Sequence, residues 1–513
     1  MVTPVQRRMS QSGGGGKIFF WCALTGMVFW GGYLRLRGLD TPGLWMDEAA
    51  TVLQCTGVRE FGVPLLPNGN VCWDSFPAVY LQALGGFFTP DPQMNGRVPA
   101  ALAGTLCIAM TCAIIRLVTG QVVPALLAAF GLAFFQEQIA WSRQARPYIF
   151  VEFYFLLTLL VGVLWTQQRR RWKLAAAIIF SVLGAFTHRV GYLAPLTLLF
   201  LILAQGRYHW RIAGVTLASG ALAVVAISAA AENTNSSIFS TLGDIVSTSG
   251  TGYLPLYTQA FWREYGWISV PTAVALAPWR RHGWFTRPVA LAAFAMLLVI
   301  GTRTHLYADR YAFLFSVCVC LLFPIGMANL WSGFTSPKGR RVAPWALGAL
   351  VVLPLIQGPI IITSRAEYPL GMTAPTPPWR EAYALVRERE TGQSGASHHF
   401  DVLSAFPALH DIYLSGMVGT KWYTPISYSG FPGDIWPAPP YTTAGLTRCR
   451  ADIEALSGYA ILDDFALRMM VDEEVRSYFC TVKPNAILRA EKQCVYIWIL
   501  NPRQAHDDID ESE

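Results

Sequence analysis

The sequence predicts a mainly α-helical membrane protein, a polytopic bundle of about eleven membrane-spanning helices followed by a C-terminal mixed α/β domain. Three observations carry this prediction. The 513 residues are 53% hydrophobic and only 14% charged, whereas a soluble domain averages about 25% charged residues. The apolar residues are grouped in blocks of about 20, the length of a helix that crosses a bilayer. Beyond residue 362 these blocks stop, and the remaining stretch has the length of a small soluble domain.

Apolar segments of sufficient length predict the individual spans. They are residues 18–36, 97–117, 121–140, 148–166, 173–188, 190–205, 212–230, 265–279, 288–303, 311–332 and 343–362. The segment 75–88 is apolar but short, which favours an interfacial helix over a span. The first span is followed by Arg35 and Arg37 rather than by a small-residue cleavage site, so we expect no cleavable signal peptide.

The basic residues predict the orientation of the bundle. With a cytoplasmic N-terminus, all five cytoplasmic loops carry positive charge, as the positive-inside rule requires. These loops contain Arg116, Arg169–Arg171, Arg207, Arg280 and Lys338. We therefore expect an integral plasma (inner) membrane protein in which the loop 37–96 and the region 363–513 lie outside the cytoplasm. The net charge of +7 then needs no nucleic acid to explain it.

The chain is expected to consist of a bundle, residues 1–362, and an extracytoplasmic soluble domain, residues 363–513. Within that domain, Pro378 favours the start of a helix, and 459–463 and 494–500 have the composition of strands. Cysteines are present in the first outer loop and in this domain, so one disulfide in each is a hypothesis that spacing alone does not settle. Cysteines within the spans are expected to act as small apolar residues.

Charged residues from distant loops are predicted to meet at the outer membrane face, against the positive-inside bias. Acids together with arginines suggest a site for an anionic, phosphate-bearing ligand at the outer leaflet. The ones of interest are Asp47, Glu48, Arg97, Arg143, Arg146, His188 and Arg310.

Each of these residues also has a purely structural interpretation. Asp47 is equally well explained as the N-cap of a helix, and Glu48 as a residue that favours the helix dipole. Arg97 and Arg146 would serve as anchors at span ends. His188 would be a hydrogen-bonded helix-end residue, and Trp45 an interfacial anchor.

Several motifs together resemble those of the GT-C glycosyltransferases, in particular the branch related to protein O-mannosyltransferases and the aminoarabinose lipid A transferase. The most specific is Leu39-Asp-Thr-Pro-Gly-Leu-Trp-Met-Asp-Glu48 after the first span. Asn95-Gly-Arg97 opens the second span, Ser142-Arg-Gln-Ala-Arg-Pro-Tyr148 precedes the fourth, and Asp309-Arg-Tyr311 opens a late one. The resemblance covers about the first 330 residues, and it implies a GT-C type bundle.

The resemblance also implies an activity and roles for the residues. It implies an inverting glycosyltransferase that moves a sugar from a polyprenyl-phosphate donor to an acceptor glycan, lipid or protein. Asp47 becomes the candidate base, and Arg97, Arg146, Arg310 and Arg143 the candidates for the donor phosphate. Trp45, His188 and Tyr148 are candidate acceptor-binding or supporting residues. Some relatives use a divalent cation such as Mg or Mn, although no ligand set is evident in this sequence.

Adjacent residues diverge by about 100° on a helix, so Asp47 and Glu48 are not expected to face one atom. Glu48 is left with three possible tasks: orienting the acceptor, binding a metal or supporting the loop. Three other classes of protein compete with this interpretation: a transporter or flippase of lipid-linked sugars, a ligase that uses diphosphate-linked glycans, and a non-catalytic assembly protein. Transporters usually show internal repeats and charges in mid-membrane, and neither is clear in this sequence.

Overall fold

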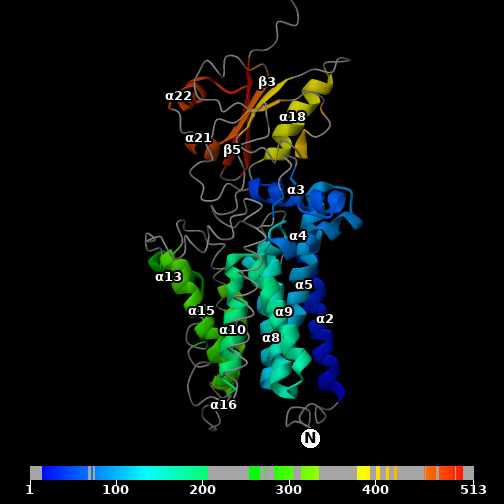
Figure 1. Ribbon diagram of the computed structural model, residues 1–513, viewed down its shortest axis with the longest axis vertical. Coiled ribbons are helices and arrows are strands. Elements are labelled where there is room, and N and C mark those ends of the chain that lie inside the picture. The colour runs from blue at the N-terminus through cyan, green and yellow to red at the C-terminus, as the bar shows by residue number, and fades with distance from the viewer. Residues whose placement is uncertain are drawn as a thin grey trace, which may run out of the picture.

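A helical bundle and a C-terminal α/β domain are stacked along the long axis of the molecule in the computed structural model (Figure 1). Two helices, α3 (Met46–Phe61) and α4 (Phe76–Ala83), lie between them. The structure describes residues 14–66, 71–72, 75–205, 254–265, 272, 282–303, 313–333, 378–392, 400–404, 409, 412–414, 417, 421–423, 456, 458–469, 473–490 and 493–500.

The bundle consists of helices that coincide with most of the expected spans. They are α2 (Gly14–Leu36), α5 (Pro92–Thr119), α6 (Val122–Phe134), α7 (Gln136–Ser142), α8 (Tyr148–Gln168), α9 (Arg171–Thr187), the 3-10 turn η2 (Arg189–Tyr192), α10 (Leu193–Leu203), α15 (Gly283–Arg303) and α16 (Phe313–Gly333). A further helix, α13 (Leu254–Tyr265), was not predicted, because it precedes the expected span 265–279. Among the described residues, four helices are long and apolar enough to cross a membrane: α2, α5, α8 and α15. The expected spans 212–230, 265–279 and 343–362 fall almost wholly outside the described residues, so the total of eleven stays a prediction.

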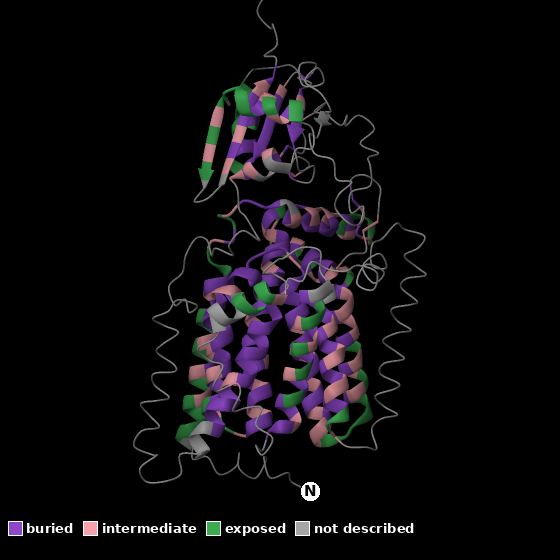
Figure 2. Cartoon of the chain, turned by 90° about the vertical axis from the view of Figure 1, so that its left-hand side faces the viewer, coloured by how far each residue is buried: buried purple, intermediate pink, exposed green. Residues whose placement is uncertain are grey.

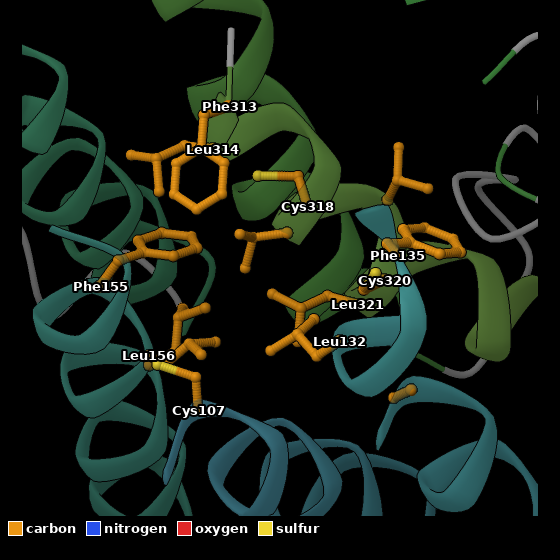
Figure 3. Close-up of a cluster of buried hydrophobic side chains, with 14 of the residues drawn as sticks. Cys107, Leu132, Phe135, Phe155, Leu156, Phe313, Leu314, Cys318, Cys320 and Leu321 are labelled. Carbon is orange, nitrogen blue, oxygen red and sulfur yellow. The ribbon is translucent and has the colours of Figure 1, made fainter. Parts of the chain in front are cut away.

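The bundle core is a continuous apolar cluster between α5, α6, α8 and α16. Phe155 and Leu156 face Phe313 and Leu321 across this core, and all four are at most 1% exposed (Figure 3). Four cysteines of the spans, Cys107, Cys112, Cys318 and Cys320, are buried in the same cluster, whereas Cys22 of α2 is exposed. Figure 2 shows buried residues filling the middle of the bundle and exposed residues along its outside.

One expected span, 121–140, is broken in the structure. The prediction of a continuous helix there is wrong: α6 ends at Phe134, Phe135 is extended (φ −69°, ψ 130°), and α7 begins at Gln136. The guanidinium of Arg35 stabilises the break, because it donates to the carbonyls of Leu132 (2.6 Å) and Ala133 (3.2 Å). The sequence at the break contains neither proline nor glycine, so no local signal announces it.

The apolar segment 75–88 is helical, as expected. Its helix α4 continues into the 3-10 turn η1 (Leu84–Phe87), and both pack against α5. The Phe87 and Phe88 side chains remain exposed at the end of this segment, 85% and 65% respectively. Exposed aromatic rings beside a membrane-spanning helix are typical of an interfacial position.

The C-terminal domain is a mixed α/β unit, which confirms the predicted class. Its five strands are β1 (Asp401–Ser404), β2 (Lys421–Tyr423), β3 (Gly458–Asp463), β4 (Ala486–Ala490) and β5 (Gln493–Leu500), in the spatial order β2-β1-β3-β5-β4. β2, β1 and β3 are parallel, and β5 is antiparallel to both β3 and β4. Helices α18 (Trp379–Gly392), α21 (Asp464–Met469) and α22 (Glu473–Thr481) accompany the sheet. α18 begins directly after Pro378, as the sequence predicts.

No disulfide joins two of the described cysteines. Cys55 is buried in α3, and burial raises the pKa of its thiol to about 12. Cys72 accepts a hydrogen bond from the Gln54 amide rather than pairing with Cys55. Cys480 and Cys494 of the C-terminal domain are unpaired as well, and Cys449 lies outside the described residues. Neither hypothetical disulfide is therefore formed among the described cysteines.

Candidate functional site

Asp47 lies in the first turn of α3, at the end of the bundle that faces the C-terminal domain. The helix is capped by Trp45 without a side-chain hydrogen bond, so the interpretation of Asp47 as the N-cap is wrong. Its carboxylate Oδ2 instead forms an ion pair with Nη2 of Arg146 at 2.9 Å, and Nη1 of Arg146 donates to the main-chain oxygen of Asp47 at 3.0 Å. The two side chains are 21% and 16% exposed, so the pair is reachable from solvent.

Aromatic side chains lie against Arg146, the basic member of this pair. The guanidinium of Arg146 lies over the rings of Trp45 (5.4 Å) and Tyr148 (5.7 Å), at the distance of cation–π contacts. The rings of Tyr148 and His188 contact each other in a T-shaped arrangement, with the centroids 5.0 Å apart. The structure therefore brings together five residues singled out in the sequence, although they come from α3, α8, the loop before α8 and the end of α9.

His188 occupies the junction between α9 and the following 3-10 turn. Its Nδ1 accepts a hydrogen bond from the main-chain nitrogen of Val190 at 3.2 Å. This is the helix-end role that the structural interpretation expected, and the same ring contacts Tyr148 beside Arg146. His188 thus caps the 3-10 turn η2 and also belongs to the aromatic group near Arg146.

Glu48 points away from Asp47 and into the protein. Its carboxylate pairs with Arg97 through two hydrogen bonds of 2.9 and 2.7 Å, and the two side chains are only 1% and 2% exposed. The Oε1 atom also accepts from the main-chain nitrogen of Ala145 at 2.7 Å. Because Ala145 directly precedes Arg146, Glu48 holds the loop that carries the partner of Asp47.

Arg97 is fully engaged by protein groups. Besides Glu48, it donates to the carbonyls of Leu39 (2.8 Å), Pro42 (2.7 Å) and Gly43 (3.0 Å). Each of its five N–H groups therefore meets a protein oxygen. The prediction that Arg97 binds the donor phosphate is not supported by this geometry.

Arg143 is also committed to the backbone. Its Nη groups donate to the carbonyls of Leu34, Arg35, Arg37 and Gly38, which cap the end of α2. A phosphate contact by Arg143 is likewise unsupported, because its Nη groups serve the carbonyls that a helix end leaves unsatisfied. Arg310, the last arginine of the predicted phosphate set, lies outside the described residues.

A buried acid in α8 escaped the sequence interpretation. Glu152 is 0% exposed, four residues after Tyr148. The Gln138 amide, in the orientation that satisfies both of its ends, donates to the Glu152 carboxylate at 2.7 Å and accepts from Ser316 at 2.8 Å. A single acid inside an apolar segment was the available signal, since such residues are rare within membrane spans.

No metal site is evident in the described part of the chain. It contains no group of three or more histidine, cysteine, aspartate or glutamate side chains that would hold an ion.

Solved structures with the same architecture are GT-C glycosyltransferases. ArnT from Cupriavidus metallidurans, bound to undecaprenyl phosphate, is 13% identical; the match covers 95% of this chain and 98% of that one, with a TM-score of 0.58. The oligosaccharyltransferase AglB from Archaeoglobus fulgidus, in complex with an inhibitory peptide and a dolichol-phosphate, is 13% identical, with 88% and 70% covered and a TM-score of 0.57. The apo oligosaccharyltransferase of the same organism is 14% identical, with 77% and 63% covered and a TM-score of 0.54.

These likenesses show that the chain has the GT-C fold, as the sequence motifs implied. No protein-family model matches the sequence, and no curated protein matches it. At this level of identity the shared architecture speaks for the fold, and the activity has to be argued from the site itself.

Proposed function

We propose that this protein is a glycosyltransferase that moves a sugar from a polyprenyl-phosphate donor to a hydroxyl of an acceptor at the outer face of the membrane. One observation carries the proposal: the solvent-reachable carboxylate of Asp47 faces Arg146 at the end of an apolar bundle. A carboxylate and a cation at this end of the bundle support a site at which a lipid-linked donor meets an aqueous acceptor. The structures of the same fold that hold undecaprenyl phosphate and dolichol-phosphate support a lipid-phosphate donor.

In the proposed reaction Asp47 acts as the general base. The acceptor hydroxyl gives its proton to the carboxylate while its oxygen attacks the anomeric carbon of the donor. The bond between that carbon and the phosphate oxygen breaks, and its electron pair leaves with the polyprenyl phosphate. Attack from the side opposite the leaving group inverts the anomeric configuration.

Arg146 is the proposed phosphate ligand. It is the predicted arginine that the described structure leaves beside Asp47, and both residues are partly open to solvent. As the donor binds, Arg146 exchanges its contact with the carboxylate for the leaving phosphate, whose growing negative charge it stabilises. This exchange also releases Asp47 to accept the proton. Arg310 is retained as a second candidate.

The remaining site residues hold this arrangement in place. Glu48 and Arg97 fix the start of α3, where Asp47 lies, and the loop that carries Arg146, so we assign Glu48 to loop support rather than to the acceptor or a metal. The aromatic group near Arg146 consists of Trp45, Tyr148 and His188. We further propose that the N-terminus is cytoplasmic and that the C-terminal domain faces the outside, where the acceptor glycan, lipid or protein is found.

Turnover with a defined donor tests this proposal. The purified protein would receive synthetic polyprenyl-phosphate sugars and candidate acceptors, and released polyprenyl phosphate would be measured. We expect Asp47→Asn to lower the rate by about 10²- to 10⁴-fold, the usual contribution of a positioned base. Asp40→Asn is the matched control, because this exposed acid lies in the segment before α3 and contributes its main-chain oxygen, which the substitution keeps, to the contacts of that segment.

Full turnover by a folded Asp47→Asn protein would show that the base is assigned wrongly. Transfer of the intact lipid-linked sugar across a vesicle membrane, without release of polyprenyl phosphate, would favour the flippase alternative. Consumption of a diphosphate-linked donor alone would favour the ligase. Mass spectrometry of lipid that co-purifies with the protein would identify the carrier and its sugar.

A further inference from the structure

The segment 37–45, which leads from α2 to Asp47, has no regular secondary structure of its own. Its backbone polar groups are bound largely by side chains from elsewhere in the chain. Such contacts decide where the first turn of α3 lies, because buried main-chain groups need partners. The source of each contact therefore shows which parts of the protein position Asp47.

One side of this segment is held by α5, within the bundle. Arg97 binds three of its carbonyls, those of Leu39, Pro42 and Gly43. The Gln93 amide donates to the carbonyls of Asp40 at 3.0 Å and Pro42 at 2.7 Å. These contacts are made by side chains of the bundle itself.

The other side is held by the C-terminal domain, more than 300 residues later in the chain. Nη1 of Arg380, in α18, donates to the carbonyl of Asp40 at 2.7 Å. The hydroxyl of Tyr413 accepts from the main-chain nitrogen of Leu44 at 2.9 Å and donates to Gln93 at 3.4 Å. Leu44 precedes Asp47 by three residues, so this contact is made immediately before α3 begins.

Tyr413 is itself held firmly within the C-terminal domain. Its ring stacks on Tyr383 with the centroids 5.5 Å apart, and the Tyr383 hydroxyl lies 2.9 Å from the Ser404 hydroxyl at the end of β1. Burial raises the pKa of Tyr413 to about 12, which keeps the hydroxyl neutral and able to both accept and donate. A series of packed and hydrogen-bonded groups thus connects the sheet to Leu44.

Apolar packing reinforces the polar contacts. Leu44, Ala49 and Val52 of the loop and α3 share one buried cluster with Trp379 and Leu414 of the C-terminal domain. Figure 1 shows α3 lying between the bundle and this domain. The element that carries Asp47 is therefore packed against both.

We propose that Tyr413 and Arg380 are positioning residues, through which the C-terminal domain holds Asp47 in register with Arg146. The proposal rests on the proposed function for its catalytic meaning. Loss of either contact frees the backbone before α3, and a shift of about 1 Å in a catalytic group is enough to lower a rate by about 100-fold.

Hydrogen exchange of the full-length protein tests the positioning without reference to any activity. We expect Tyr413→Phe and Arg380→Gln to speed exchange of the amides of residues 40–48 by about 3- to 10-fold, because each variant loses a hydrogen bond to the backbone of this segment. The matched controls are Tyr459→Phe and Arg387→Gln. Tyr459 donates to Glu390 within the C-terminal domain, and Arg387 lies on the exposed face of α18. Unchanged exchange at residues 40–48 in both test variants would overturn the proposal.

Turnover supplies the catalytic readout. Tyr413→Phe and Arg380→Gln should lower kcat by about 10-fold or more while KM for the donor stays unchanged, and Arg380→Lys should restore part of the loss. An equal fall in all variants, controls included, would contradict specific positioning. Hydrogen exchange tests the positioning independently of the assignment of Asp47 as the base. If Asp47→Asn is still active, the base is assigned wrongly, and the exchange result alone decides this inference.

Discussion

The buried pair of Glu48 and Arg97 should have a large and non-additive effect on stability. Glu48→Gln keeps the shape of the side chain but leaves the charge of Arg97 buried, at 2% exposure, without its counter-ion. Removing one partner of a buried ion pair costs about 3–5 kcal/mol. Arg97→Met should cost more, because it also leaves the carbonyls of Leu39 and Gly43 without this donor, at about 1–3 kcal/mol for each buried group, while the Pro42 carbonyl keeps its bond from Gln93.

The double variant provides the decisive comparison. Once Arg97 is replaced, Glu48→Gln removes a stranded carboxylate and should cost little more, so the two changes are expected to couple by about 1.5–3 kcal/mol. Reversible unfolding in mixed SDS and detergent micelles, followed by tryptophan fluorescence, measures all three variants against the parent protein. The reasoning is refuted if the two costs add within about 0.5 kcal/mol, or if Glu48→Gln costs less than about 1 kcal/mol.

Three further predictions concern other parts of the chain. Burial raises the pKa of Asp463 from 3.8 to about 7, so its stabilising contribution is complete below pH 4 and lost as the pH rises through 7. Asp463→Asn should therefore be more stable than the parent protein at pH 8, by at most about 4 kcal/mol. The Tm of this variant should also change less between pH 5 and pH 8 than the Tm of the parent protein does. Gly85→Ala should destabilise by about 3 kcal/mol or more in the same unfolding assay, because its Cβ would lie 1.6 Å from the Asn95 carbonyl oxygen, whereas Gly26→Ala meets no atom within 4 Å and should change stability by less than about 1 kcal/mol. A topology reporter placed after residue 400 should read as external, and a cytoplasmic signal there would reverse the proposed orientation.

The sequence was informative wherever a feature depends on composition or on topology. Apolar length located most of the described bundle helices, and the alternation of basic loops placed Asp47, Arg146 and His188 at one end of the bundle before any contact was known. The strands 459–463 and 494–500 followed from β-branched and aromatic composition. These predictions required only the period and length of a pattern.

The partners of individual side chains were beyond the sequence. In the sequence, Arg97 and Arg146 are both outer arginines at span ends. In the structure, Arg97 is buried in an ion pair with Glu48, whereas Arg146 is partly exposed in an ion pair with Asp47. The difference lies in how α3 packs between the bundle and the C-terminal domain, which no local pattern records. The break at Phe135 is similar, because its cause is a donor from Arg35, about 100 residues away.

The two adjacent acids therefore differ in role because they lie in different environments. A helix separates neighbouring side chains by about 100°, so a helix lying on a protein surface turns one toward the core and the next toward solvent. Here Glu48 meets Arg97 and the nitrogen of Ala145 in the interior, while Asp47 meets Arg146 at the surface. A charge that must stay buried and paired makes a rigid anchor, and a charge that is partly open can change partners during a reaction. In the proposed reaction, Arg146 exchanges Asp47 for the phosphate while Glu48 keeps the start of α3 and the loop of Arg146 fixed.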